Sequence, residues 1–153
     1  MTESLQVIKK LQFKDDRQPV LILNAPKSYN KIMCGFEGEV HQEGILGSYN
    51  FIQVFGTSNS ELQKLSLKVI TYVKEDGLLW LCYPKKTSKT YKGSDCSRDQ
   101  VAGLLSAEGY EPVRQIAIDE DWSALRFRKT ENIKKMTRKF AVTEKGKERT
   151  QGN

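Results

Sequence analysis

The chain has 153 residues and a net charge of +6, with 38% hydrophobic and 29% charged residues. These values suit one soluble globular domain with a loose tail. No apolar run approaches the roughly 20 residues that a membrane span needs, and the N-terminus lacks the apolar core of a secretory signal. We therefore expect a cytoplasmic protein with no membrane partner.

The first half of the chain predicts short elements. Apolar residues over 5–11 indicate a short amphipathic helix, and the continuous apolar run 20–23 is typical of a strand buried on both faces. A short helix is expected over 29–34. Closely spaced glycines then punctuate 35–49, with one short strand near Val40.

From residue 50 the pattern becomes regular. Residues 50–55 predict a strand, and Ser58 with Glu61 three positions later forms a capping box. The helix that starts there is expected to end at Gly77. The most apolar run of the chain, 78–83, follows as the predicted central strand.

The same order then repeats towards the C-terminus. Ser97 and Gln100 form a second capping box, Gly109 closes the second helix, and strands over 112–118 and 123–128 form a hairpin. Buried strands that alternate with capped helices argue for a parallel sheet. The predicted fold class is therefore α/β, three-layered and Rossmann-like, with a mostly parallel sheet and an antiparallel edge hairpin at the C-terminal end.

The basic charge is concentrated at the C-terminus. Residues 129–153 hold eight basic and three acidic side chains, so they carry +5 and leave +1 for residues 1–128. We therefore expect one α/β domain over 1–128, with 1–16 as an N-terminal extension, and a flexible basic tail. The tail could bind a phosphate backbone. Aromatic side chains for base stacking are nearly absent from it, so a solubilising tail is an alternative.

Few residues suggest a metal or a disulfide. Cys34, Cys82 and Cys96 lack a close C-x-x-C spacing, so neither a disulfide framework nor a structural zinc site is expected. Cys82 is predicted to be a small core residue. His41, the single histidine, has no visible orienting neighbour and is predicted to lie at the surface. We predict no metal and no cofactor.

The loop after the predicted central strand is the first candidate site. It reads Pro-Lys-Lys-Thr-Ser-Lys over 84–89, and its ammonium and hydroxyl groups could hold a phosphate or a carboxylate with help from the helix that starts at Ser97. A solvated surface loop is the alternative reading. The chain contains no P-loop pattern.

Two further stretches bear on function. The acidic run 119–121 precedes Trp122 and Ser123, and it could bind a cation or a hydroxylated ligand or simply form an acidic hairpin turn. No histidine is near enough in sequence to activate the serine. The turn Asn24-Ala-Pro26 occupies the place of a nucleotide binder's glycine-rich turn, which disfavours a dinucleotide or a conventionally held adenosyl group.

Several of these motifs together resemble an uncharacterised bacterial family, known as a domain of unknown function. The resemblance covers roughly residues 17–128. It is carried by the stretches 23–26, 84–88, 107–110 and 119–127, the last of which reads Asp-x-x-Trp-Ser-x-Leu-Arg-Phe, and by the strand that contains Trp80. The resemblance implies no activity and no substrate.

The C-terminal half is also similar, more distantly, to class I methyltransferases. That resemblance implies an antiparallel closing strand and places the end of strand 78–83 near a substrate. Two features of that family are not found in the sequence, namely the glycine-rich cofactor loop and an acidic residue after the second strand. The resemblance therefore implies a methyltransferase-like fold without the usual cofactor site.

The sequence thus favours a non-catalytic binding or interaction module that takes a small anionic ligand. Its rivals are an enzyme that acts on a phosphorylated or carboxylated metabolite, and a nucleic-acid-binding protein that uses the basic tail. No catalytic residue is predicted. The expected ligand-binding residues are Asn24, Lys85, Lys86, Thr87, Ser88, Trp122, Ser123 and Arg126.

Overall fold

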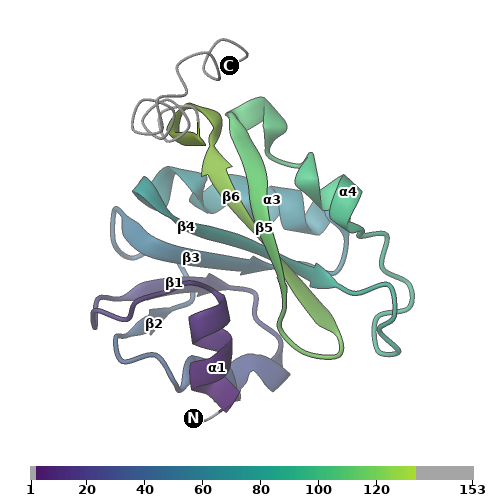
Figure 1. Ribbon diagram of the computed structural model, residues 1–153, viewed down its shortest axis with the longest axis horizontal. Coiled ribbons are helices and arrows are strands. Elements are labelled where there is room, and N and C mark those ends of the chain that lie inside the picture. The colour runs from purple at the N-terminus through teal and green to yellow at the C-terminus, as the bar shows by residue number, and fades with distance from the viewer. Residues whose placement is uncertain (1–2, 134–153) are drawn as a thin grey trace, which may run out of the picture.

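One six-stranded sheet organises the protein, whose computed structural model describes residues 3–133 (Figure 1). Its order is β2-β1-β3-β4-β6-β5. The first four strands in this order are parallel neighbours. β6 runs antiparallel to both of its neighbours, β4 and β5, so the sheet is mostly parallel with an antiparallel hairpin at its edge, as predicted. The strands are β1 (Val20–Leu23), β2 (Val40–His41), β3 (Tyr49–Phe55), β4 (Val73–Pro84), β5 (Tyr110–Ala117) and β6 (Trp122–Lys129).

Helices cover both faces of this sheet and make three layers (Figure 1). On one face, α1 and α2 pack through Val7, Ile8 and Ile32. On the other face, α3 and α4 pack through Leu62 and Val101. The helical elements are α1 (Glu3–Lys10), η1 (Lys27–Tyr29), α2 (Asn30–Met33), α3 (Asn59–Val69), η2 (Ile70–Tyr72), α4 (Arg98–Ala102) and η3 (Ser106–Glu108).

Both predicted capping boxes start a helix, but the predicted end of the first helix is wrong. The Ser58 hydroxyl accepts the Glu61 N–H, and the Ser97 hydroxyl accepts the Gln100 N–H. α3 ends at Val69, and Gly77 lies inside β4. After η2 the chain enters β4 at Val73, a β-branched residue that lies opposite Tyr49 of β3, so strand pairing replaces the expected helix.

The second predicted helix is shorter than expected. It divides into α4 and η3, although Gly109 ends it in the left-handed conformation (φ 82°) as the sequence indicates. The short strand near Val40, the helix around 29–34 and the C-terminal hairpin are confirmed with small changes of boundary. Cys82 is fully buried in β4, as predicted.

Buried polar contacts fix the helical layer of α1 and η1 on the sheet. The indole N–H of Trp80 donates to the Leu11 carbonyl just after α1 (3.0 Å), and both residues are fully buried. The hydroxyl of Tyr29 donates to Gln53 Oε1 (2.9 Å), and Gln53 Nε2 contacts Cys82 Sγ (3.2 Å). These partners satisfy groups that would otherwise be costly to bury.

The carboxyl ends of β1, β3 and β4 lie at one edge of the sheet, together with the turn between β5 and β6. Open α/β sheets bind their ligands at this edge. Asn24 Nδ2 donates to the Phe55 carbonyl (2.9 Å), and the Gly56 N–H donates to the Cys82 carbonyl (3.1 Å). The edge therefore positions the candidate sites. Among the described residues, no helix has the length and apolar character to cross a membrane.

Candidate functional site

A cation-lined cavity of about 270 Å³ opens where β4 ends. Lys85 and Lys86 follow β4 directly, and Arg98 is the first residue of α4, whose cap at Ser97 turns the chain towards the same space. The cavity thus combines one ammonium pair with one guanidinium. Its lining residues are Tyr83, Pro84, Lys85, Lys86, Thr87, Ser97, Arg98, Gln115 and Ser123.

The electrostatics of this cavity favour an anion. No carboxylate is among its lining residues. Arg98 does pair with Asp99, whose Oδ1 lies 3.8 Å from Arg98 Nη1, but the pair is exposed, and such exposed pairs contribute little. Gln115 Nε2 donates to the Tyr83 hydroxyl (3.0 Å). Burial raises the pKa of Tyr83 while the charge of Arg98 opposes that rise, so the phenol stays a neutral donor.

A hydrogen-bonded clamp holds the loop that carries the two lysines. Ser88 Oγ donates to Asp121 Oδ1 (2.8 Å) and accepts the Tyr91 N–H (3.1 Å). The Lys85 N–H donates to the Asp121 carbonyl (2.8 Å). Ser88 is only 3% exposed and is not among the cavity's lining residues. In the structure its hydroxyl shapes the loop and is already engaged.

The eight residues expected from the sequence divide in space. Lys85, Lys86, Thr87 and Ser123 share the cation-lined cavity, whereas the buried Ser88 does not line it. The structure adds Tyr83, Ser97, Arg98 and Gln115, of which only Ser97 had a visible signal, its capping box.

The remaining three expected residues lie elsewhere. Trp122 is 3% exposed and packs edge-on against Phe55 and Tyr91 (centroids 5.1 and 5.0 Å apart). Arg126 is half-buried on the α1 face, where its Nη1 donates to Gln12 Oε1 (3.3 Å). Asn24 closes the end of β1 onto β3 through its side-chain amide. None of them lines the cation-lined cavity.

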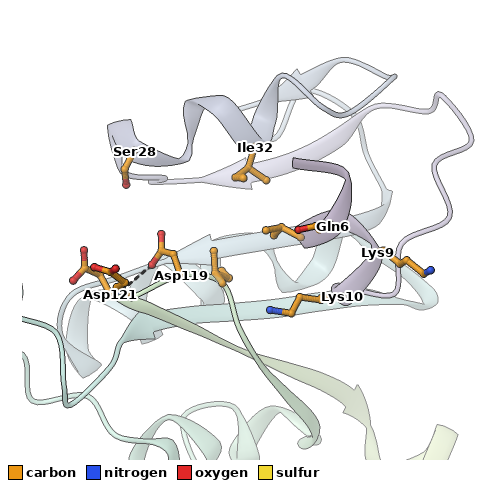
Figure 2. Close-up of a pocket in the computed structure, with 10 residues that line it drawn as sticks. Gln6, Lys9, Lys10, Ser28, Ile32, Asp119 and Asp121 are labelled. Atoms are coloured by element: carbon orange, nitrogen blue, oxygen red, sulfur yellow. Dashed lines mark hydrogen bonds between the residues drawn. The ribbon is translucent and has the colours of Figure 1, made fainter. Parts of the chain in front are cut away.

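A larger cavity of about 850 Å³ lies on the α1 face at the same edge. Figure 2 shows Ser28 on the wall opposite the Asp119 and Asp121 carboxylates, while the Lys9 side chain points away from the space. Apolar side chains complete the walls. The full lining is Gln6, Val7, Lys9, Lys10, Ser28, Ile32, Ile118, Asp119, Glu120 and Asp121.

Much of this second cavity's polar chemistry is engaged by the chain itself. Asp119 Oδ1 accepts the N–H groups of Asp121 and Trp122 (2.8 and 2.9 Å), and Lys10 Nζ donates to the Ala117 carbonyl (2.8 Å). Cationic and anionic groups line the same space. The second cavity therefore selects no ligand charge as clearly as the cation-lined cavity does. Within residues 3–133, no group of histidine, cysteine and acidic side chains is placed to hold a metal.

The expectation for His41 is wrong in one respect. Its Nδ1 lies 2.7 Å from the Tyr49 hydroxyl, which also accepts the N–H groups of Ile45 and Leu46. That hydroxyl therefore donates its proton to Nδ1. The imidazole has an orienting neighbour after all and is partly buried. The contact anchors the loop between β2 and β3.

Several solved structures with a similar fold are methyltransferases. The chain is similar to a SAM-dependent methyltransferase from Aquifex aeolicus (15% identity, 81% of this chain and 88% of that one, TM-score 0.60). It is also similar to the mitomycin 7-O-methyltransferase MmcR (7%, 83% and 54%, TM-score 0.56) and to the tRNA methyltransferase TrmK of B. subtilis (6%, 84% and 65%, TM-score 0.53). The fold is methyltransferase-like. No protein-family model matches the sequence, and no curated protein matches it.

At these identities the likeness establishes the fold alone, and a fit to an S-adenosyl ligand depends on the residues present. The turn after β1 contains Pro26, which has no N–H to donate, and the Asn24 amide is committed to the Phe55 carbonyl. The structure does locate an acidic residue after the second strand, because exposed Glu43 follows β2 by two positions. The turn after β1 does not fit the usual mode of holding an adenosyl ligand, which relies on a glycine-rich turn.

Proposed function

We propose that this protein is a non-catalytic binding module on a methyltransferase-like fold, and that it holds an anionic ligand in the cation-lined cavity after β4. One observation carries the proposal: Lys85, Lys86 and Arg98, from two different elements, line one cavity that no carboxylate lines. Charge-assisted hydrogen bonds from ammonium and guanidinium groups are the protein's strongest contacts to phosphate and carboxylate.

The surrounding polar groups support this ligand class. Thr87, Ser97 and Ser123 supply hydroxyls at the same cavity. A neutral Tyr83 phenol adds a group that can donate to an oxyanion. A volume of about 270 Å³ suits a small ligand or the charged end of a larger one.

The turn after β1 supports a role without methyl transfer. The turn contains Pro26, which has no N–H, and Asn24, whose side-chain amide is hydrogen-bonded to β3. They stand where the usual adenosyl-binding turn needs glycine. The resemblance to an uncharacterised family adds no activity to this proposal. An S-adenosylmethionine titration tests the non-catalytic part: we expect no heat of binding at micromolar concentrations, and a micromolar dissociation constant would overturn it.

Thermal unfolding with phosphate, pyrophosphate and citrate tests the anion site. A ligand that binds only the folded state adds about 2.7 kcal/mol to the free energy of unfolding at a concentration 100 times its Kd, and this raises Tm. We expect one of these probes to raise the Tm of the wild type, and Lys85→Ala with Lys86→Ala to remove that rise.

The matched control is Lys89→Ala with Lys92→Ala. These lysines lie in the same loop and are exposed, but do not line the cavity. The control should keep the rise, which also separates specific binding from the general stabilisation that excluded salts give any protein. Equal rises in both double variants, or no rise in the wild type with any probe, would contradict the proposed anion site.

A further inference from the structure

Three arginines gather on the α1 face, on the far side of the sheet from α4. Arg126 and Arg128 are two positions apart on β6, so their side chains leave the same face, about 7 Å apart along the strand. Arg114 of β5 lies directly opposite Arg126 in the antiparallel register. The hairpin thus places three guanidinium groups on one patch.

Acidic partners neutralise only part of this patch. Asp76 binds Arg128 with both carboxylate oxygens (2.8 and 2.6 Å), and Glu111 lies opposite Arg128 in the register. Arg114 forms no ion pair among the described residues, and the hydrogen bond of Arg126 goes to a neutral amide, that of Gln12. Within residues 3–133, neither Arg114 nor Arg126 is therefore in a direct ion pair with a carboxylate.

This arrangement works against stability in the isolated protein. Like charges directly opposite each other on neighbouring strands are destabilising. Burial lowers the pKa of the Arg126 guanidinium, and the charges of Arg128 and Arg114 lower it further, against the opposing effect of Asp76. The Arg126 Nε is buried and has no hydrogen-bond partner in the described part of the chain. An oxyanion between Arg114 and Arg126 would relieve the repulsion.

The position of the patch favours a polyanion over a single small ion. β6, which carries Arg126 and Arg128, ends at Lys129, and the sequence from there to residue 153 has eight basic and three acidic side chains. Guanidinium groups match the geometry of phosphate oxygens, and successive cations suit a chain of phosphates.

We propose that Arg114 and Arg126 form a docking surface for the phosphate backbone of a nucleic acid, on the α1 face of the sheet. The surface is separate from the cation-lined cavity. Gln115 and Ser123 line that cavity, and each is an odd number of positions from the arginine on its own strand. Their side chains therefore leave the opposite face of the sheet from Arg114 and Arg126. If the docking surface were disproved, the proposed anion site would therefore still stand, and disproof of the anion site would leave the docking surface standing.

The test is fluorescence anisotropy of the full chain with a labelled oligouridylate of 20 nucleotides, from low to physiological salt. We expect binding that weakens steeply with salt. Arg114→Gln with Arg126→Gln should weaken binding about tenfold at low salt and reduce the salt slope by about 1.4, because each lost phosphate contact to a single strand contributes about 0.7.

The matched control is Lys64→Gln with Lys68→Gln. It removes the same charge from exposed positions of α3, on the opposite face. It should change affinity less than about threefold, since it removes no docking contact. Equal losses in the two double variants would show that net charge alone matters and would overturn the proposal, as would absence of wild-type binding at low salt.

A single variant covers the case in which the double arginine variant fails to fold. Arg114 is exposed, so Arg114→Gln should leave Tm unchanged or slightly raised, because it removes the like-charge pair. It should lower the salt slope by about 0.7. An unchanged slope and affinity in this folded variant would also overturn the docking surface.

Discussion

Ser88 and Asp121 are joined by a 2.8 Å hydrogen bond that ties the loop after β4 to the turn between β5 and β6. These residues are 33 positions apart in the chain. The bond sets the position of the backbone that carries Lys85, whose N–H donates to the Asp121 carbonyl. The candidate anion site therefore depends on a residue that does not line it.

Removing this bond should loosen the loop. Ser88→Ala leaves Asp121 Oδ1 without this part-buried donor, so we expect a loss of about 1–2 kcal/mol in the free energy of unfolding, measured with urea. The neighbouring Glu120→Gln is the control, because that exposed side chain should matter by less than about 0.5 kcal/mol. Equal effects of the two changes would argue against the clamp.

The exposed pair of Arg98 and Asp99 predicts opposite effects on anion affinity. Arg98→Gln removes a cavity-lining cation and should weaken binding of the anion about three- to tenfold, as for a solvent-exposed ion pair of about 1 kcal/mol. Asp99→Asn removes the carboxylate 3.8 Å from Arg98 and should tighten binding slightly. Titration calorimetry with the probe that raises Tm measures both. Tighter binding by the Arg98 variant would be incompatible with the proposed site.

The buried contact between Tyr29 and Gln53 should be one of the costlier polar contacts to lose. Tyr29→Phe leaves Gln53 Oε1 without its donor in a fully buried position, so we expect a loss of about 1–3 kcal/mol in urea unfolding. Tyr72→Phe serves as the control. The Tyr72 side chain is partly exposed, and its hydroxyl forms no hydrogen bond within residues 3–133. A loss no larger than the control's would refute the assigned contact.

Stability should fall at alkaline pH. Burial raises the pKa of the Cys82 thiol and of the Tyr29 phenol above their ordinary values of 9.0 and 10.0. Above about pH 9 the unfolded chain releases protons that the folded chain retains. The free energy of unfolding is therefore unaffected by these groups below about pH 9 and declines as pH rises further. Urea unfolding between pH 7 and 11 measures the decline. Cys82→Ala should flatten its first part, and a flat profile in the wild type would contradict the buried thiol.

The sequence alone was sufficient for the class of fold. The apolar runs that became β1, β3 and β4, the capping boxes at Ser58 and Ser97 and the alternation in β6 are local patterns, and local sterics and burial decide them. The end of α3 was missed because pairing of Val73 with Tyr49 outweighed the local signal of Gly77. Strand pairing of that kind depends on a partner elsewhere in the chain.

The site depended much more on tertiary structure. The sequence predicted a cationic loop at Lys85 and Lys86, since charge and composition are readable along the chain. Only the folded sheet shows that Arg98 joins them and that Arg126 lies on the opposite face. Side chains alternate between the faces of a strand, and neighbouring strands come from distant segments. Which charges share a surface is therefore fixed by sheet order and register, which no local pattern contains.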